Sequence, residues 1–334
     1  MKPLKVGLLG GGSWGTTVAS LTAKNCPTTM WARNQATVDD INNNHCNSKY
    51  LPHATLTKSL RATNSIQAAV KDADVIVMGV PAQSFRKVLI DARPYIRPWV
   101  PIVSLAKGLE RGTKMRMTQV IEHEMPGHPA GVLTGPNLAR EIIKGQAAAS
   151  VIAMVDDTIS SKLQKIFETG LFRVYTNEDV VGCELGGALK NIIAIAAGMG
   201  DGANAGENTR SAIITRGLAE LTRLGVAMGG KSLTFAGLTG MGDLVATCTS
   251  TQSRNRHVGF QLGQGRKLDD IIEEMSMVAE GVKTSGVVME LAQEYGISMP
   301  IMTEVHKVLY EGNTVFDAFK GLIRQQASSE SDPG

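Results

Sequence analysis

The chain has 334 residues, which is enough for two domains, and 43% of them are hydrophobic, which is enough to form a core in each. The formal net charge is only +3, and no run of basic residues supports a nucleic-acid partner. The four cysteines are scattered without a CxxC pair, which is typical of reduced thiols in a cytoplasmic protein that holds no metal. The sequence shows no signal-peptide pattern, and no uncharged apolar run is long enough to span a membrane.

The first predicted elements surround a glycine-rich turn. Residues 4–9 form a short apolar run that is typical of a buried strand, and residues 16–21 read as a helix. Between them Gly10, Gly12 and Gly15 have the GxGxxG spacing. The first glycine permits a tight turn, the second lets backbone approach a pyrophosphate, and the third lets helix and strand pack closely. Because the N-terminus of the helix would face the anion, this stretch predicts a dinucleotide site.

The second predicted strand, residues 28–31, is followed by Arg33. Sites that prefer NAD usually carry Asp or Glu near this point to bind the ribose hydroxyls. A guanidinium suits the 2′-phosphate of NADP instead, so the sequence favours NADP and admits NAD. Two alternatives are that Arg33 is a solvated residue after the strand, or that it stacks on the adenine without contacting the phosphate.

Strands and helices then alternate as far as residue 176, which indicates a doubly wound parallel sheet of the α/β Rossmann type. The further strands are predicted at residues 74–81, 101–106, 130–137, 147–155 and 172–176. The helices between them are predicted at residues 82–91, 113–124, 138–143 and 158–168. Lys107 follows one of these strands, at the sheet edge where ligands bind, although it could also be a solvated loop residue.

No convincing strand follows residue 177, and the later segments read as helices. These are predicted at residues 178–199, 209–228, 240–249, 254–263, 268–275, 281–295, 300–310 and 315–323. The sequence therefore predicts a dinucleotide-binding domain over residues 1–177, an all-helical substrate domain over 178–324 and a disordered tail over 325–334.

The stretch at residues 182–198 is small and apolar on all sides, yet it contains Lys190 with Asn191 beside it. A helix of this composition is buried, and a buried ammonium loses hydration unless a partner is supplied. We therefore regard Lys190 as a candidate for moving protons in a cleft. The alternatives are that Lys190 reaches the surface or pairs with a structural carboxylate.

Two polar features follow in the helical part. Asp243 stands in a glycine-rich apolar segment, where it could serve a site or simply cap the next helix. Residues 247–256 offer hydroxyls, an amide and two guanidinium groups where a helix begins, which favours phosphate binding. The alternative for residues 247–256 is a polar loop with a capping serine.

Six stretches of the sequence match one enzyme family. They are GGGSWGT at residues 10–16, WARN at 31–34, SLAKG at 104–108, GP at 135–136, ELGGALKNIIAIAAG at 184–198 and TFAGLTGMGDLVATCTSTQSRNRHVG at 234–259. With them the chain resembles the bacterial NAD(P)-dependent sn-glycerol-3-phosphate dehydrogenases over essentially its whole length. The resemblance implies reversible hydride transfer between NAD(P)H and dihydroxyacetone phosphate, a product used in glycerophospholipid synthesis in the cytoplasm, and a homodimer.

The resemblance also implies roles for residues at matching positions. Lys190 would be the general acid/base, and Lys107 would contact both substrate and cofactor. The implied cofactor contacts are Ser13, Trp14, Arg33, Ala139, Arg254, Val278 and Glu280. The implied substrate contacts are Gly135, Asn137, Asp243, Ser253, Arg254 and Asn255. Position 137 departs from the family, because Asn stands where many relatives have a hydroxyl residue, so an amide would make that contact in place of a hydroxyl.

The residues fit this chemistry. Reduction of a ketone needs a hydride donor and a proton donor to the developing alkoxide, and Lys190 could supply that proton. Asp243 could position or balance Lys190, Lys107 could polarise the carbonyl, and the residues at 254–255 could hold the phosphate.

Two other functions fit part of the pattern. One is a β-hydroxyacid or 6-phosphogluconate-type dehydrogenase, which shares the two-domain layout. The other is a nucleotide-sensing regulator that binds NADPH without turnover, a role that gives no reason to keep Lys107, Lys190 and Asp243 together.

Overall fold

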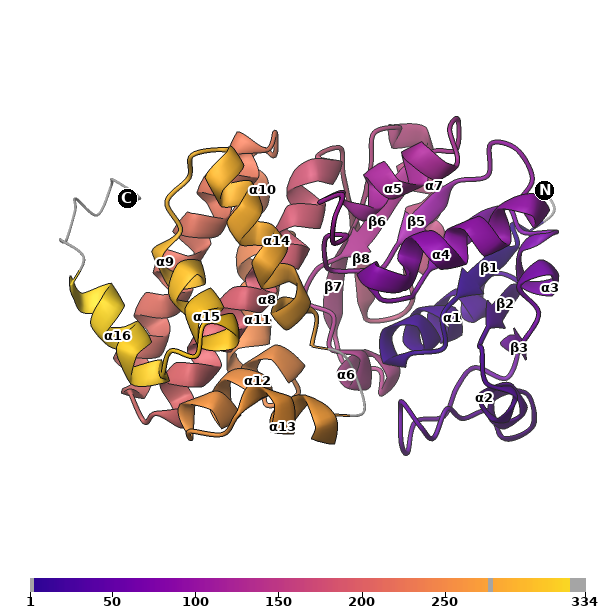
Figure 1. The fold of residues 1–334 in the computed structure, drawn as a ribbon. Coiled ribbons are helices and arrows are strands. Elements are labelled where there is room, and N and C mark those ends of the chain that lie inside the picture. The colour runs from indigo at the N-terminus through magenta and orange to yellow at the C-terminus, as the bar shows by residue number, and fades with distance from the viewer. Residues whose placement is uncertain (1–2, 276–278, 325–334) are drawn as a thin grey trace. The chain divides into compact units, whose positions relative to one another are not determined.

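The computed structural model describes residues 3–275 and 279–324, and it divides into two compact units (Figure 1). Unit 1 contains the chain up to Ala106 together with Met115–Val180. Unit 2 combines Lys107–Lys114 with the chain from Val181 onward. The domain limits predicted from the sequence, 1–177 and 178–324, stay a prediction. The predicted disordered tail at 325–334 lies outside the described residues.

Unit 1 is built on one eight-stranded sheet with the strand order β3-β2-β1-β4-β5-β6-β7-β8. Its strands are β1 (Val6–Leu9), β2 (Thr28–Trp31), β3 (Arg61–Thr63), β4 (Val75–Met78), β5 (Ile102–Ser104), β6 (Ala130–Thr134), β7 (Ala148–Met154) and β8 (Phe172–Asn177). The strands from β1 to β6 pair in parallel, whereas β7 runs antiparallel to β6 and parallel to β8. The predicted Rossmann-type α/β class is confirmed, but the predicted parallel direction is wrong for the last two strands.

The reason lies in the connection after β6. A parallel crossover needs a segment that carries the chain back along the full length of the sheet, usually a long helix. The helix in this connection, α6 (Ala139–Ile143), has only five residues. At 1.5 Å per residue it covers about half the length of a five-residue strand, so the chain turns back directly and β7 reverses direction.

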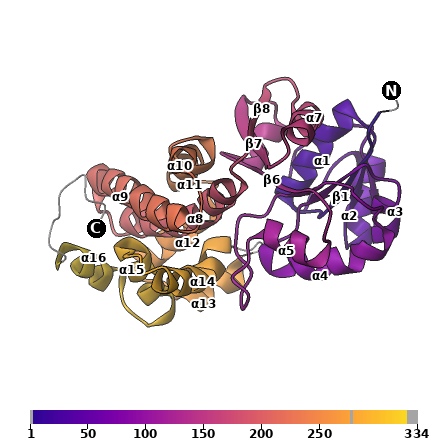
Figure 2. The same cartoon turned by 90° about the horizontal axis from the view of Figure 1, so that it is seen from above.

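Helices cover both faces of the sheet (Figure 2). They are α1 (Ser13–Asn25), α2 (Gln35–Asp39), α3 (Ile66–Val70), α4 (Ala82–Ala92), α5 (Met117–Glu124), α6 and α7 (Asp157–Phe167), with short π and 3₁₀ turns at Asp40–Asn44 and Arg93–Tyr95. Alternate residues of one strand enter different cores: Val75 and Val77 of β4 pack with α1 and α7, whereas Ile76 packs with α4 and α5. Both faces are buried, which explains why these strands read as continuous apolar runs.

Every described residue of unit 2 lies in a helix, turn or loop, as the sequence predicts from residue 178 onward. Its helices are α8 (Val180–Gly202), α9 (Gly206–Ala227), α10 (Ser232–Phe235), α11 (Asp243–Thr249), α12 (Arg254–Gly263), α13 (Leu268–Glu274), α14 (Glu280–Glu294), α15 (Pro300–Tyr310) and α16 (Val315–Arg324), with a π turn at Leu238–Gly242. The short helix α10 has no counterpart in the prediction.

Helix α8 is the centre of unit 2. By length and composition α8 could cross a membrane, but 94% of its most apolar window is buried inside the protein, so core packing accounts for its composition. Its glycines let α12 approach backbone to backbone. A Cβ at Gly198 would lie 2.1 Å from the carbonyl oxygen of Arg256, and a Cβ at Gly259 would lie 2.0 Å from that of Ile195. This packing fixes α12 against the C-terminal part of α8, and the hydrogen bond from Asn255 to Asn191 brings the start of α12 next to Lys190.

Candidate active site

The glycine turn of unit 1 has the shape that the GxGxxG spacing predicts. Gly10 adopts a φ of 134°, which an L side chain rarely adopts, and a Cβ on Gly15 would lie 2.3 Å from the carbonyl oxygen of Gly10. A Cβ on Gly12 would meet no atom within 4 Å, so the backbone is open to a ligand there. Gly12 is also the N-cap of α1 and offers no side-chain cap, so the turn fits a pyrophosphate at the helix N-terminus.

The implied cofactor residues of unit 1 lie near this turn in the sequence or in the sheet. Arg33 is exposed and follows β2, whose Trp31 pairs with Leu9 at the end of β1. The Ser13 hydroxyl donates a hydrogen bond of 2.9 Å to the carbonyl of Tyr50. The Thr17 hydroxyl of α1 donates one of 3.4 Å to the carbonyl of Ala139 at the start of α6.

The Trp14 ring is held by the protein itself. It packs edge-on against Phe172 with ring centroids 6.2 Å apart and joins the core between the sheet and α1. Because the indole ring is packed in this core, the implied cofactor contact of Trp14 is expected to come from its backbone and not from stacking of its ring.

The turn after β6 carries the implied substrate residues of unit 1. Gly135 has a φ of 137°. The Asn137 side-chain amide donates a 3.3 Å hydrogen bond to the Ser150 hydroxyl, which donates one of 2.8 Å to the carbonyl of Thr134. The Asn137 side-chain carbonyl oxygen is buried and accepts no hydrogen bond from the residues that the structure describes. A buried acceptor of this kind is open to a ligand hydroxyl, as the implied substrate contact at position 137 would require.

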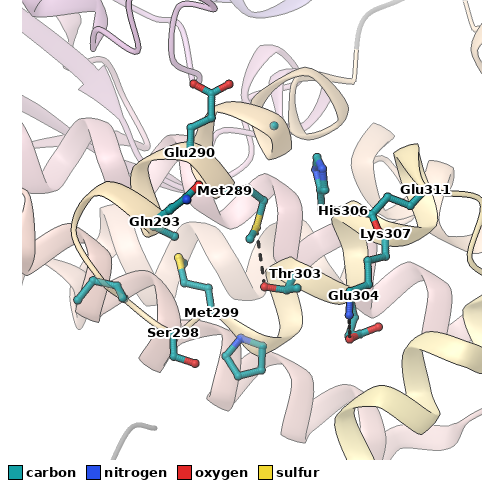
Figure 3. A pocket seen from close by; sticks show the side chains of 14 residues that line it. Met289, Glu290, Gln293, Ser298, Met299, Thr303, Glu304, His306, Lys307 and Glu311 are labelled. Atoms are coloured by element: carbon teal, nitrogen blue, oxygen red, sulfur yellow. Dashed lines mark hydrogen bonds and ion pairs between the residues drawn. The ribbon is translucent and has the colours of Figure 1, made fainter.

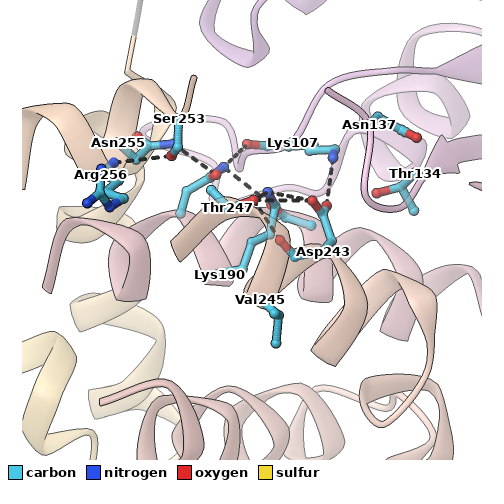
Figure 4. A network of polar contacts seen from close by, with 12 residues as sticks. Lys107, Thr134, Asn137, Lys190, Asp243, Val245, Thr247, Ser253, Asn255 and Arg256 are labelled. Carbon is cyan, nitrogen blue, oxygen red and sulfur yellow. Dashed lines mark hydrogen bonds and ion pairs between the residues drawn. The ribbon is translucent and has the colours of Figure 1, made fainter. Parts of the chain in front are cut away.

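Unit 2 gathers two lysines around one carboxylate (Figure 4). Lys190 Nζ lies 2.8 Å from Asp243 Oδ1, and Lys107 Nζ lies 2.6 Å from Asp243 Oδ2. Lys190 and Asp243 are 3% and 2% exposed, so both charges are almost fully removed from water. Lys190 also donates a hydrogen bond to the Thr247 hydroxyl, which donates one of 2.6 Å to the carbonyl of Asp243 one turn earlier in α11. Two positive charges on one negative charge leave the cluster suited to an anion.

Lys107 reaches this cluster because its segment leaves the sheet. Lys107–Lys114 pack with unit 2, where Leu109 is fully buried in the helical core. Lys114 forms ion pairs with Glu290 and Glu294 of α14. Burial lowers the pKa of Lys107 from 10.5 to about 8, and the charge of Lys190 acts in the same direction while Asp243 opposes both.

A chain of amides continues from the cluster. Asn191 donates a hydrogen bond of 3.2 Å to the carbonyl of Lys107 and accepts one of 2.9 Å from the Asn255 amide. The Asn255 carbonyl oxygen in turn accepts the backbone N–H of Gly281 at 3.0 Å. Asn191 therefore fixes the backbone of Lys107 to the starts of α12 and α14.

The remaining implied residues of unit 2 lie at helix starts. Ser253 caps α12, because its hydroxyl accepts the backbone N–H of Arg256 at 3.2 Å. Arg254 is the first residue of α12 and is exposed, and Glu280 is the first residue of α14. Val278 lies outside the described residues.

One cavity lies in a different part of unit 2 (Figure 3). It has a volume of about 640 Å³ and lies between α14 and α15, with Met289, Thr303 and His306 among its lining residues. None of the predicted site residues that the structure describes lines it. Among the described residues no group of three His, Cys, Asp or Glu side chains could hold a metal ion.

Sequence reasoning did not single out Thr247 or assign a role to Asn191. Thr247 lies four residues after Asp243, and Asn191 directly follows Lys190, so the helical spacing next to the predicted residues was a usable signal for both. Neither residue type is unusual in a helix, which is why composition alone did not identify them.

Comparisons with known proteins match the chain over its whole length. The N-terminal and C-terminal models of the NAD-dependent glycerol-3-phosphate dehydrogenase family match residues 5–160 and 179–320. A protein named glycerol-3-phosphate dehydrogenase NAD(P)+ 2 from Sphingopyxis alaskensis is 61% identical over 331 residues, which cover 99% of each chain. The enzyme named glycerol-3-phosphate dehydrogenase NAD(P)+ 1 from Mycobacterium tuberculosis is 57% identical over 327 residues, covering 98% of this chain and 96% of that one.

A solved structure agrees with these matches. The crystal structure of the glycerol-3-phosphate dehydrogenase from Coxiella burnetii is 35% identical, with a TM-score of 0.92, and covers 97% of this chain and 99% of that one. The resemblance drawn from the sequence is confirmed. The matches favour it over the two alternative functions.

Proposed function

This chain belongs to the NAD-dependent glycerol-3-phosphate dehydrogenase family, and on that premise we propose that it transfers a hydride reversibly between NAD(P)H and dihydroxyacetone phosphate. In the reducing direction the product is sn-glycerol 3-phosphate. The observation that carries the proposal for this chain's own residues is the Asp243 carboxylate, which bridges Lys190 and Lys107 in the buried part of unit 2.

Lys190 is the proposed general acid/base. A bound reduced nicotinamide would supply the hydride, and the carbonyl oxygen of the ketone would then need a proton. Lys190 Nζ is held by Asp243 and by the Thr247 hydroxyl, which limits the directions in which it can donate a proton. In the oxidising direction the same nitrogen takes the proton back from the hydroxyl. Asp243 balances the charge of Lys190 in a site from which water is largely excluded.

Lys107 is proposed to polarise the carbonyl. Its pKa of about 8 leaves it mostly protonated at neutral pH, so it can stabilise negative charge on the oxygen as the hydride arrives. The Asn191 hydrogen bond to its carbonyl and the burial of Leu109 hold the Lys107 backbone in place.

The start of α12 is proposed to hold the substrate phosphate. Arg254 and the buried Asn255 and Ser253 occupy the first turn of a ten-residue helix, whose N-terminus favours anions. A phosphate bound there would use remote binding energy to orient the reacting carbon. Asn137 and Gly135 of unit 1 are proposed as further substrate contacts.

The cofactor is proposed to bind along the glycine turn of residues 10–15, with NADPH favoured over NADH through Arg33. The support is the exposed guanidinium at the end of β2, in the place where NAD-preferring sites usually carry a carboxylate. Ser13, Trp14, Ala139, Lys107, Arg254, Val278 and Glu280 are the other proposed cofactor contacts.

We further propose that the protein is a cytoplasmic homodimer that supplies glycerophospholipid synthesis. The family resemblance supports all three statements. The dimer has a second support in the apolar side chains that unit 2 exposes around α10 and α11, among them Leu233, Met241 and Val245, which are 83%, 45% and 42% exposed. Sedimentation of the purified protein tests the dimer directly.

The activity is tested by following nicotinamide absorbance with purified protein and dihydroxyacetone phosphate, using NADPH and NADH in parallel. We expect loss of absorbance with both cofactors, and faster loss with NADPH. Faster turnover with NADH than with NADPH would be consistent with the proposed reaction but would contradict the proposed role of Arg33. Tight NADPH binding without turnover would contradict the proposed reaction.

A further inference from the structure

A segment that sequence analysis left without a role lies against the glycine turn. Residues 45–51 connect the π turn after α2 to the chain that leads into β3, and they belong to unit 1. The segment folds on itself, because the carbonyl of Asn47 accepts the backbone N–H groups of Tyr50 and Leu51 at 3.1 and 2.8 Å. Leu51 is 1% exposed, and the backbone N–H of Ser48 donates a 2.8 Å hydrogen bond to the Asp40 carboxylate. The segment is therefore held within unit 1 by its own contacts at Ser48 and Leu51.

Asn47 makes the contact. Its side chain is 1% exposed, and its amide nitrogen donates hydrogen bonds of 3.0 Å to the carbonyl of Gly11 and 2.8 Å to the Thr16 hydroxyl. The orientation of the amide is set by chemistry, because a backbone carbonyl can only accept, so the group facing Gly11 must be the NH₂. In the other direction the Ser13 hydroxyl donates to the carbonyl of Tyr50 at 2.9 Å. These three bonds join the segment to both sides of the turn.

The hydrogen bond from Asn47 to the Gly11 carbonyl also sets the direction of the Gly12 N–H group, which faces the proposed pyrophosphate site. The carbonyl of Gly11 and the N–H of Gly12 belong to one planar trans peptide, so they point in opposite directions. When Asn47 holds the carbonyl, it also fixes the direction of the Gly12 N–H, at the position where a Cβ would meet open space. Three consecutive glycines have more backbone freedom than any other tripeptide, so without a brace much of that freedom would be lost on binding.

We propose that Asn47 is a positioning residue for the cofactor: its buried amide holds the turn of residues 10–16 in the shape that receives the pyrophosphate of NAD(P). The inference deepens the proposed dinucleotide site and rests on it. Asn47 acts through the backbone of Gly11 and the Thr16 hydroxyl.

The test compares two variants of Asn47 with a matched asparagine. Asn47→Ala removes both donors, and Asn47→Asp keeps the shape of the side chain but turns an acceptor toward the carbonyl of Gly11. The control is Asn42→Ala, since Asn42 also exchanges two hydrogen bonds of 2.9 Å with backbone, but with Ala62 of β3 and away from the turn. We would measure Kd for NADPH and NADH by fluorescence, kcat at saturating cofactor, KM for dihydroxyacetone phosphate, and urea unfolding.

We expect Asn47→Ala to raise the Kd values for NADPH and NADH about tenfold. The reason is that a buried acceptor left unpaired, here the Gly11 carbonyl, changes an equilibrium constant by about a factor of ten. Asn47→Asp should raise them further, whereas kcat at saturating cofactor and the KM for the ketone should change less than about twofold. Asn42→Ala should lower stability and leave both Kd values within about twofold. Thr16→Val, which removes one of the two acceptors, should give a smaller rise than Asn47→Ala and gives a second reading if Asn47→Ala does not fold.

If Asn47→Asp bound the cofactors as tightly as the wild-type protein, the inference would be overturned, because the shape of the side chain would then suffice without its donated hydrogen bonds. An equal rise in Kd for Asn42→Ala would also overturn it, since the effect would then follow general stability. A wild-type protein that binds neither NADPH nor NADH would contradict the proposed function itself, and this outcome is distinct from both of these.

Discussion

The glycine turn of unit 1 and the lysine–aspartate cluster of unit 2 are both proposed to bind negatively charged groups, and they would do so by different means. Residues 10–16 contain no ionisable side chain, so the turn offers backbone N–H groups at the start of α1 and depends on the absence of Cβ atoms. The cluster depends on side chains, with two ammonium groups held within 2.8 Å of one buried carboxylate. Cofactor binding at the turn should therefore be sensitive to substitutions that change its shape. Turnover at the cluster should be sensitive to substitutions that change charge or protonation.

The largest effect is expected from Lys190. Lys190→Ala should lower kcat by about 10³-fold, because a positioned general acid typically contributes two to four orders of magnitude, while the Kd for NADPH stays near the wild-type value. Stopped-flow turnover and fluorescence titration measure the two quantities.

Lys190→Arg separates charge from proton transfer. The guanidinium keeps the positive charge beside Asp243 but does not release a proton at any working pH. We expect Lys190→Arg to be nearly as slow as Lys190→Ala. An active arginine variant would show that Lys190 acts only as a balancing charge.

The next largest effect is expected from substitutions that add a methyl group to the glycine turn, and two of them are compared. Gly15→Ala places a Cβ 2.3 Å from the carbonyl oxygen of Gly10, whereas Gly12→Ala places one in open space. We expect Gly15→Ala to lower the free energy of unfolding by about 3 kcal/mol and to weaken cofactor binding. Gly12→Ala should change stability by less than about 1 kcal/mol and still weaken binding, because its methyl group occupies the ligand side. Urea unfolding beside NADPH titration checks both, and normal binding by Gly12→Ala would place the pyrophosphate elsewhere.

The difference between the two regions also explains how much the sequence could predict. The turn depends on residues within six positions, so the spacing of Gly10, Gly12 and Gly15 was sufficient to find it. The cluster joins positions 107, 190 and 243, and only the resemblance brought these three together before the structure did. No local pattern states that the segment at Lys107–Lys114 packs with the helical unit.

Two features were missed for the same physical reason. β3 and the segment at residues 45–51 lack a periodic apolar pattern, so nothing in the sequence marks β3 as a strand or residues 45–51 as a contact of the glycine turn. Asn47 lies 31 positions from Thr16, and its role depends on a contact that only the folded chain makes. The reversal of β7 was also missed. The helix at residues 138–143 was predicted, but the alternation of strands and helices was interpreted as a parallel sheet throughout, and α6 is too short for a parallel crossover.

The pH dependence of kcat/KM tests the role of charge in the lysine–aspartate cluster. Lys107 has a pKa of about 8, so it is protonated below that pH and loses its charge as the pH rises through it. If the charged form polarises the carbonyl, kcat/KM for dihydroxyacetone phosphate should fall with rising pH above about 8, approaching tenfold per pH unit. Lys107→Arg stays charged and should lose this decline, although its turnover will be lower. A decline at the same pH in Lys107→Arg would assign the titration to another group.

The smallest effect is expected at Arg33, where charge acts on the cofactor side. Arg33 is exposed, so the loss of one charge-assisted hydrogen bond to a 2′-phosphate should cost about a factor of ten in affinity. Arg33→Ser should therefore raise the Kd for NADPH about tenfold and leave the Kd for NADH within about twofold, because NADH lacks that phosphate. Arg97→Ser is the matched control, since Arg97 pairs with Asp74 at the start of β4, the opposite end of the strand from the ligand edge. Equal changes in both cofactors would mean that Arg33 stacks on the adenine, and then the turn of residues 10–15 alone would select for dinucleotides without distinguishing NADP from NAD.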